Sequence, residues 1–550
     1  MIFALIIAPI VAGVLLVLVP RSAEAFAKWF GVALATIVFI IVALEPHASD
    51  ESLRWLSRPF VANFHVGLGG IGYWIVLLLA LSTACALAVT RVPRQRDFVA
   101  QMLVLLGAMT GLFVARDLLL FALFWDLMLI PVFLTLIAWS PTRSTATAWR
   151  YLVYNLVGGL ALLLATAAYG VVQGTTDVLA ANPSMLAPIS PAWAFWIFLG
   201  FAFAFLIKTP VWPLHTWMPL TYADLPAPMV AVVSAVQSKA GLYGFIVVTS
   251  VLLPGPMHGA APAMFVLGLI ALVYGALAAL VQDDAKRVVA YSSLSHLGLI
   301  VLAIFSFNPI ALGGAVVYIV AHGLFSAGLF IVLGEVERRE DTRLLSRLGG
   351  LGARNPKLAG GLTILALATL GLPGLCGFAG EILILTGVYR AGFVWPAVVA
   401  LIPIIIAAAY MLRVLQGLMN GPEVADVPQR RDMTPLEMLA LAPLVIAIVL
   451  LGVNPGPVAA SSRALTSAAT ALANVQTQSQ SGIAYCKQAL LDQRRNAMER
   501  AQRYLASLPR DVNGRPIVPT AQPATIGSVQ EPSCLRYPDV MAAAVKATAK

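Results

Sequence analysis

The hydrophobic positions of this chain form long, almost uninterrupted runs, separated by short polar stretches. A helix needs ~20 apolar residues to cross ~30 Å of hydrocarbon, and backbone groups in lipid must find partners within their own segment. The short alternating segments of a membrane barrel are missing from the pattern. The runs therefore predict an all-α polytopic membrane protein with fourteen transmembrane helices, at residues 2–20, 29–45, 72–90, 98–114, 118–139, 151–173, 192–218, 227–252, 262–281, 288–306, 309–334, 359–389, 394–418 and 436–453.

Two of these spans contain helix-breaking residues. The seventh has Pro210 and Pro213 after Lys208, and the twelfth has Gly371 and Pro373 before Glu381. Interior proline removes a helical hydrogen bond, and glycine weakens the helix. Broken helices at matching positions are typical of transporters built from inverted repeats. The breaks lie five spans apart, which predicts three N-terminal spans (1–97), two inverted five-helix repeats (98–252 and 262–418) and a final span (436–453).

The last part of the chain has a different composition. Residues 461–480 are rich in Ala, Ser, Thr and Gln, and residues 485–508 have the pattern of a polar helix. We therefore expect residues 455–550 to form a soluble C-terminal extension. Cys486 and Cys534 lie in it and have two possible states. They form a disulfide if the extension faces an oxidising compartment, or they remain two free thiols.

Composition agrees with a membrane location. Hydrophobic residues make up 60% of the 550 residues and charged residues 11%, whereas a soluble domain carries about 25% charged residues. The net charge of +10 comes from Lys and Arg concentrated in alternate loops, where they set topology rather than bind nucleic acid. This alternation places both termini outside. The first segment lacks a basic start and a clear cleavage site, so we interpret it as the first span.

Motifs for bound cofactors are absent from the sequence. The four cysteines form no C-x-x-C pair, and no glycine-rich nucleotide motif occurs in a βαβ setting. We therefore expect no metal, nucleotide or redox cofactor in this chain.

A small set of ionisable residues falls deep inside the predicted spans, where a charge costs ~2.5–3.5 kcal/mol on insertion scales. The set comprises Asp126, Lys208, Lys239, His296, His322 and Glu381. Considered apart from the rest of the set, Asp126 and Lys208 could form a static ion pair, and each histidine could be a hydrogen-bonded residue of the core. Together they suit a relay of protons or cations, because burial disfavours the charged form of each and brings unlike groups toward similar proton affinities. His215 either gates proton access or caps a helix end.

Several motifs resemble the antiporter-like subunits of respiratory complex I, most closely the group of subunit M and mitochondrial subunit four. They are FWDLMLIPVFL, LIKTPVWPLHTWMP, AYSSLSHLGLIVLAI, VVYIVAHGLFSAGLFIVLGEVERREDTR, LGGL and LGLPGLCGFAGEILIL, in the family's order and spacing. The resemblance covers roughly residues 70–455 and implies fourteen helices with two inverted repeats.

The resemblance also implies residue roles. Asp126 stands where the family has a glutamate that pairs with Lys208, and it is one methylene shorter. Lys239 is similar to the central relay lysine, and His296 and His322 continue the hydrated axis. Glu381 matches the terminal proton carrier. An acid there favours subunit M, because subunits L and N and the Mrp antiporters usually have lysine.

By this resemblance the chain is a proton-translocating membrane subunit of an NADH:quinone oxidoreductase in a bacterial inner membrane, with both termini periplasmic. Its expected partners are L- and N-type neighbours and lipid, not nucleic acid. NAD, FMN, iron–sulfur clusters and quinone would belong to other subunits. Three alternatives remain open: an Mrp-type Na⁺/H⁺ antiporter subunit, a membrane subunit of a related hydrogenase or ferredoxin-linked complex, and a purely structural bundle.

Overall fold

The computed structural model describes residues 1–45, 50–141, 145–178, 189–420 and 431–463, together with Arg495, Glu499, Arg503, Ala506 and Ser507. The chain divides into two compact units, Met1–Ala468 and Ala469–Lys550. Nearly all described residues belong to the first unit, to which this section refers. Cys486 and Cys534 lie outside the described residues, so the predicted disulfide stays a prediction.

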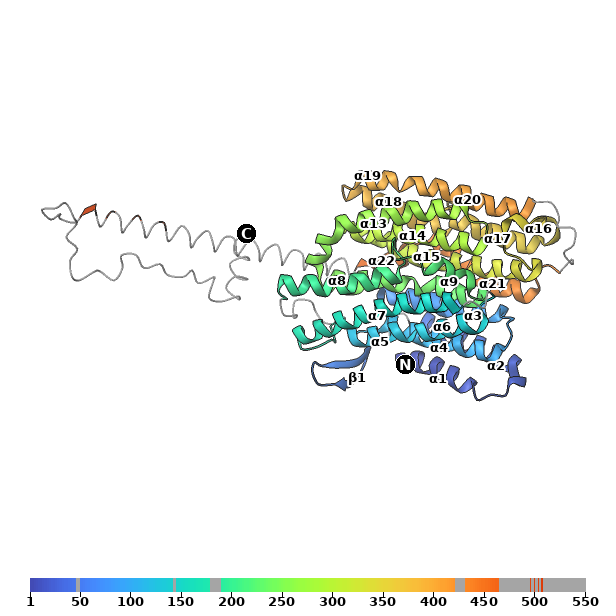
Figure 1. Cartoon of the computed structure of the whole chain (residues 1–550), viewed down its shortest axis with the longest axis horizontal. Coiled ribbons are helices and arrows are strands. Elements are labelled where there is room, and N and C mark those ends of the chain that lie inside the picture. The colour runs from blue at the N-terminus through green and yellow to red at the C-terminus, as the bar shows by residue number, and fades with distance from the viewer. Residues whose placement is uncertain are drawn as a thin grey trace. The chain divides into compact units, whose positions relative to one another are not determined.

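The first unit is a bundle of long helices that run alongside one another, with one short β-hairpin (Figure 1). Its N-terminal part contains α1 (Ile2–Leu16), η1 (Arg21–Ala23), α2 (Glu24–Leu44), β1 (Glu51–Leu56), β2 (Ala62–Val66), α3 (Gly70–Val89), α4 (Gln95–Val114), α5 (Leu118–Leu127), α6 (Leu129–Trp139), α7 (Thr145–Gln173), α8 (Pro191–Lys208) and α9 (Met218–Asp224).

The eighth span is assembled from α10 (Ala227–Val232), η3 (Val233–Gln237), α11 (Lys239–Gly244), η4 (Phe245–Thr249) and α12 (Ser250–Leu252). The remaining elements are α13 (Pro254–Val281), α14 (Ala285–Phe305), α15 (Pro309–Glu340), η5 (Leu345–Arg347), α16 (Leu351–Arg354), α17 (Pro356–Thr369), α18 (Cys376–Arg390), α19 (Val394–Val399), α20 (Leu401–Asn420), α21 (Pro435–Val453) and α22 (Gly456–Ala460).

The predicted all-α polytopic architecture is confirmed. Within the described ranges, twelve helical segments are long and apolar enough to cross a membrane, and the shorter apolar helices α1 and α17 account for the two other predicted spans. Some boundaries differ: α13 starts at Pro254 rather than at residue 262, and α15 continues to Glu340. Helix α22 buries Val458 and contacts α15, so the first unit extends beyond the predicted start of the C-terminal extension at residue 455.

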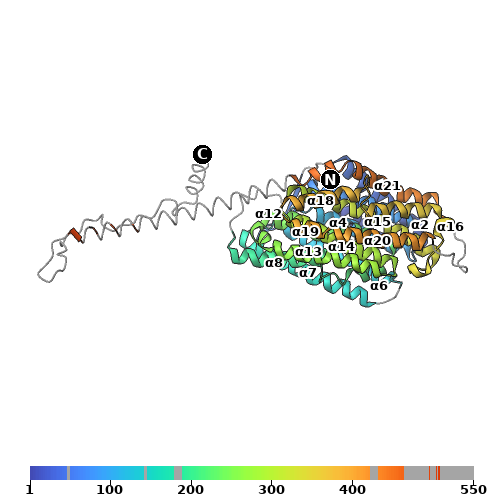
Figure 2. The same cartoon turned by 90° about the horizontal axis from the view of Figure 1, so that it is seen from above.

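The core of the bundle is formed by the eighth span, α14 and α15. Their apolar lengths are almost entirely buried, whereas α2, α20 and α21 expose most of theirs. In both views α14 and α15 lie among the other helices (Figure 1, Figure 2). Helices that face lipid expose apolar side chains, as these outer helices do. Three of the six residues of the predicted relay, Lys239, His296 and His322, lie on the inner helices.

Both predicted helix breaks are present. Helix α8 ends at Lys208, and α9 starts only at Met218, after the two prolines. The Trp217 indole Nε1 donates to the Ile207 carbonyl over 3.0 Å, which holds the non-helical segment against the end of α8. In the twelfth span, α17 ends at Thr369 and α18 starts at Cys376, with Gly371 at φ +69° between them. A glycine suits that backbone conformation because it lacks a Cβ. The division into two inverted repeats stays a prediction.

The sequence did not reveal two local features. The eighth span contains two π-helical turns, Val233–Gln237 and Phe245–Thr249, in place of a regular α-helix. A polar end of the bundle carries the hairpin of β1 and β2, which pairs Glu51 with Val66 in antiparallel register. The hairpin is attached to the bundle through Arg116, whose backbone N–H donates to the His65 carbonyl over 2.9 Å, and through a 2.7 Å contact of His65 Nδ1 with Asp177.

Asp117 caps α5 at this end of the bundle. Its carboxylate accepts hydrogen bonds from the backbone N–H groups of Leu119, Leu120 and Asn63 and from the Thr176 hydroxyl. Burial raises the pKa of Asp117, although these hydrogen bonds favour its charged form. The cap fixes the start of the helix on which Asp126 lies.

Candidate relay of buried ionisable residues

Lys239 lies at the centre of the bundle on the irregular eighth span. The residue is fully buried, and its Nζ donates to the backbone carbonyl of Ser234. Ser234 belongs to the π-helical turn η3, and such turns occur frequently at functional sites. The Ser234 hydroxyl lies 3.5 Å from the Ser326 hydroxyl of α15. The turn thus connects the ammonium group of Lys239 to the helix that carries His322.

The two predicted histidines form a pair. His296 on α14 and His322 on α15 have ring centroids 5.5 Å apart at an interplanar angle of 78°. Phe325 packs on both rings, with centroid distances of 5.7 Å and 5.2 Å. Both nitrogens of His322 and Nδ1 of His296 are buried without a hydrogen-bond partner among the described residues. An unpaired buried polar group costs ~1–3 kcal/mol, so these three nitrogens call for a functional explanation.

A tyrosine connects the histidine pair to the predicted terminal acid. The Tyr318 hydroxyl donates a 2.6 Å hydrogen bond to Oε1 of Glu381 on α18. The ring of Tyr318 lies 5.7 Å from the His296 ring at 84°. Sequence reasoning missed Tyr318, although it precedes His322 by one helical turn and therefore shares its face. Nearby, the hydroxyls of Ser292 and Tyr410 lie 2.7 Å apart.

Asp126 and Lys208 are neighbours without a direct ion pair. No described contact within 4 Å joins the two charged groups, and Asp126 Oδ1 and Lys208 Nζ are both buried without a hydrogen-bond partner. They still interact electrostatically. Lys208 Nζ lies 4.9 Å from the centroid of the Trp125 ring, a cation–π distance. No direct contact of the kind implied by the family resemblance is therefore described between these two side chains.

A glycine on α7 makes room for the Asp126 carboxylate. A Cβ atom at Gly159 would collide with Asp126 Oδ1, while the adjacent Gly158 lies against Ile207 at the end of α8. Helix α7 therefore lies directly beside both Asp126 and the end of α8. Close approach of backbone to a functional group is a common use of glycine.

His215 lies apart from the other predicted residues. It is 4% exposed in the non-helical segment between α8 and α9, and its ring packs on Tyr274 of α13 with centroids 5.1 Å apart. Its described ring contact is with α13 rather than with the relay. The two alternatives for His215, gate or helix cap, therefore both stay predictions.

The described residues contain no group of three or more His, Cys, Asp or Glu that could hold a metal ion. Cys85 and Cys376 are free and buried. The described chemistry of the site is therefore that of proton donors and acceptors: amines, imidazoles, hydroxyls and carboxyls.

Comparisons with known proteins agree on one family. The family described as NADH:quinone oxidoreductase/Mrp antiporter, transmembrane, matches residues 115–407. Subunit M of the NADH-quinone oxidoreductase of Rhodobacter capsulatus is 31% identical over 470 residues, which are 81% of this chain and 92% of that protein.

Solved structures show the same similarity. A chain of respiratory complex I from Thermus thermophilus with bound NADH superimposes with a TM-score of 0.77 at 31% identity, covering 85% of this chain and all of that one (100%). A chain of the Mrp complex from a Dietzia species superimposes with a TM-score of 0.74 at 19% identity, covering 85% and 96%. The second likeness concerns the fold alone.

Proposed function

We propose that this chain, which belongs to the NADH:quinone oxidoreductase/Mrp antiporter transmembrane family, is a proton-translocating membrane subunit of an NADH:quinone oxidoreductase. The observation that carries the proposal is the alignment of buried polar groups from Lys239 to Glu381 inside the bundle. Ser234 and Ser326 lie beside Lys239, the rings of His322 and His296 pack on each other, and the Tyr318 hydroxyl donates to Glu381. A purely structural bundle would not need so many buried ionisable groups.

Each residue has a role in this proposal. Lys239 holds the proton at the centre of the membrane. His322 and His296 pass it on, since imidazole both accepts and donates protons near neutral pH. Glu381 is the last carrier before the outer side. Asp126 and Lys208 modulate the relay from the first half of the bundle: when the charge on Lys208 changes, the electrostatic cost of a charge on Lys239 changes as well.

The energy for this transport comes from elsewhere in the complex. Moving one proton against 100 mV costs ~2.3 kcal/mol. A single charge displaced by a few Å in a low-dielectric site changes nearby charge energies by a comparable amount. Electron transfer in partner subunits is the proposed source of that displacement, and any NAD, FMN, iron–sulfur clusters or quinone are assigned to those partners. This chain would need no redox group of its own.

The same proposal includes location and neighbours. The chain spans a bacterial inner membrane with both termini periplasmic, an orientation that the concentration of basic residues in alternate loops of the sequence supports. Its neighbours are other membrane subunits, including L- and N-type antiporter-like chains. Residues 98–252 and 262–418 are the two inverted repeats, and their breaks lie after Lys208 and before Glu381.

An Mrp-type antiporter subunit is the second candidate, because the matching family also includes Mrp antiporters. Purification of the tagged chain from its native membrane separates the two. We expect subunits that oxidise NADH and reduce quinone to co-purify with the tagged chain. After reconstitution into vesicles, the purified complex should form a membrane potential when NADH is added in sodium-free buffer. Co-purification of antiporter subunits alone, with sodium-dependent proton exchange, would favour the second candidate instead.

A further inference from the structure

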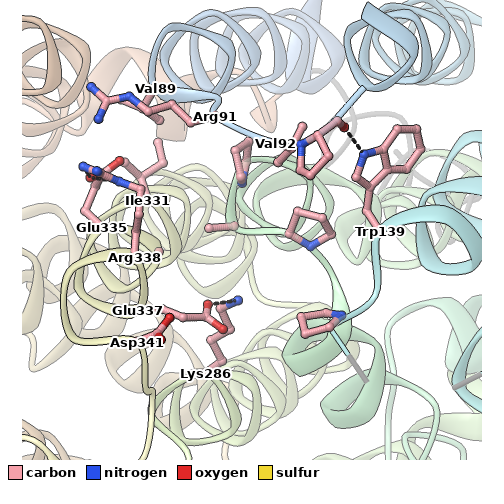
Figure 3. A pocket seen from close by; sticks show the side chains of 16 residues that line it. Val89, Arg91, Val92, Trp139, Lys286, Ile331, Glu335, Glu337, Arg338 and Asp341 are labelled. Carbon is pink, nitrogen blue, oxygen red and sulfur yellow. Dashed lines mark hydrogen bonds and ion pairs between the residues drawn. The ribbon is translucent and has the colours of Figure 1, made fainter. Parts of the chain in front are cut away.

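A cavity of about 310 Å³ lies where α6, α10, α14 and α15 meet the segment after α3 (Figure 3). Charged side chains line it, namely Arg91, Lys286, Glu335, Glu337, Arg338 and Asp341. Two other cavities of similar volume, about 410 and 330 Å³, have almost entirely apolar linings. A polar lining is a condition for stable occupancy by water. The charged cavity therefore differs in kind from the other two.

One ion pair on the wall of this cavity joins α14 to α15. Glu337 Oε2 lies 2.6 Å from Lys286 Nζ, and Figure 3 shows the two side chains facing each other, with Trp139 across the cavity. The Lys286 side chain is 2% exposed, whereas the Glu337 side chain is 28% exposed. Lys286 also contacts the Leu225 carbonyl at 3.4 Å, and Arg343 lies 3.8 Å from Glu337. A carboxylate thus lines the cavity in direct contact with a buried ammonium group.

The cavity adjoins the seam between the eighth span and α15. At the cavity, Gly334 of α15 lies against Ala227 of α10. Farther along the same seam, Ser234 and Ser326 approach to 3.5 Å, and Lys239 donates to the Ser234 carbonyl. The seven residues from Ala227 to Ser234 correspond to ~10 Å at 1.5 Å per helical residue. This is about a third of the ~30 Å hydrocarbon thickness.

We propose that this cavity is the vestibule from which cytoplasmic protons reach the relay, with Glu337 as the proton acceptor and Lys286 as its counter-ion. The proposal rests on the proton-translocating function above. A hydronium ion in the cavity gives its proton to the Glu337 carboxylate, which releases Lys286 from the ion pair. Glu337 then gives the proton to water in the seam and pairs with Lys286 again. One proton advances, and the pair returns to its first state.

A purely structural ion pair at the end of α15 is the rival explanation, and the chain offers a matched control. Glu340 lies on the same helix, three residues after Glu337. It is buried and pairs with Arg354 at 3.0 Å, but it does not line the cavity. Removing either carboxylate breaks an ion pair. Only the loss of Glu337 removes a proton acceptor from the cavity, and a small diffusible acid can replace such an acceptor.

The test uses the whole complex in inverted membrane vesicles, with NADH as donor and a potential-sensitive dye as readout. Glu337→Gln is expected to form the potential roughly tenfold more slowly than wild type. Sodium formate should restore the rate, because the cavity admits a small weak acid. Permeating formic acid dissipates a pH gradient but not the potential, so the readout stays valid. The rate of Glu340→Gln should not respond to formate.

Two further variants keep the test decisive if Glu337→Gln assembles poorly or proves ambiguous. Val92→Trp fills the cavity without removing a charge. It should slow the formation of the potential, and formate should not restore the rate. The vestibule proposal is rejected if either cavity variant forms the potential at the wild-type rate. It is also rejected if Glu337→Gln forms the potential slowly and formate does not restore its rate. Lys239→Met is measured in parallel. If Lys239→Met forms the potential slowly while the cavity variants form it at the wild-type rate, only the vestibule proposal is rejected. If Lys239→Met also forms the potential at the wild-type rate, the proposed function itself is rejected.

Discussion

The Tyr318 hydroxyl donates a 2.6 Å hydrogen bond to Glu381 Oε1, and the ring that carries it stands edge-on to His296. The tyrosine therefore lies between the histidine pair and the last acid of the proposed relay. In the proposed relay, a proton reaches Glu381 by two coupled transfers. The hydroxyl gives its own proton to the carboxylate and receives one from the histidine side, so that Tyr318 ends unchanged.

Tyr318→Phe removes this hydroxyl and keeps the ring that packs on His296 and Phe325. A hydrogen bond to a charged group contributes ~1.5–3 kcal/mol, so we expect proton translocation to slow roughly tenfold or more. Infrared difference spectra should also show the carboxyl C=O band of Glu381 at higher wavenumber, a change that mere loosening of the packing would not produce.

Tyr169→Phe is the control for that variant, because it removes a buried hydroxyl from α7 instead. It should leave both the rate and the carboxyl band unchanged. Normal translocation in an assembled Tyr318→Phe complex would exclude the tyrosine from the proton path.

Gly159→Ala tests the position of Asp126. The added methyl group would occupy the place of the Asp126 carboxylate, which must then shift from its position beside α7. We expect slower NADH-driven proton translocation in a complex that assembles normally. Gly360→Ala on α17 is the control, because nothing lies within 4 Å of its added Cβ atom. That change should be neutral or stabilise the helix by up to ~1 kcal/mol. Equal rates in the two variants would contradict a role for the Asp126 position.

Glu437→Ala tests a buried ionic cluster that joins α21 to α15. Glu437 is 1% exposed and lies 2.6 Å from Arg339, 2.9 Å from Arg338 and 3.0 Å from Arg91. Removing Glu437 takes one of two carboxylates from the buried Arg339, which keeps Glu335, so we expect a cost below the ~3–5 kcal/mol of a fully broken buried pair. Thermal unfolding of the purified complex should therefore begin at a lower temperature.

Glu499→Ala removes an acid whose side chain is 51% exposed, and it should change stability by less than ~0.5 kcal/mol. If Glu437→Ala is as stable as this control, the cluster does not hold the two helices together.

The fold was largely predictable because membrane spans are set by apolar length. The two helix breaks were predictable for a similar reason, since Pro210, Pro213 and Gly371 restrict or release the backbone locally. The candidates Lys239, His296, His322 and Glu381 stood out because charged or imidazole side chains are costly in lipid. These signals depend on composition and local geometry, both of which a sequence contains.

Relations between helices were not predictable in this way. Tyr318 looks like any aromatic residue of an apolar helix until α18 brings Glu381 beside it. The π-helical turn before Lys239 has no sequence signature, because it depends on packing against α15. Each of these features needs tertiary contacts that the one-dimensional pattern does not specify.

Translocation in the Lys239→Met variant tests the central claim most directly. Methionine has nearly the length of lysine but cannot carry a proton, so packing is kept while the centre of the relay is lost. In the assembled complex we expect the NADH-driven membrane potential to form roughly tenfold more slowly or not at all, while Lys357→Met, which removes an exposed lysine at the start of α17, behaves as wild type. A Lys239→Met complex that moves as many protons per NADH as wild type would contradict the account.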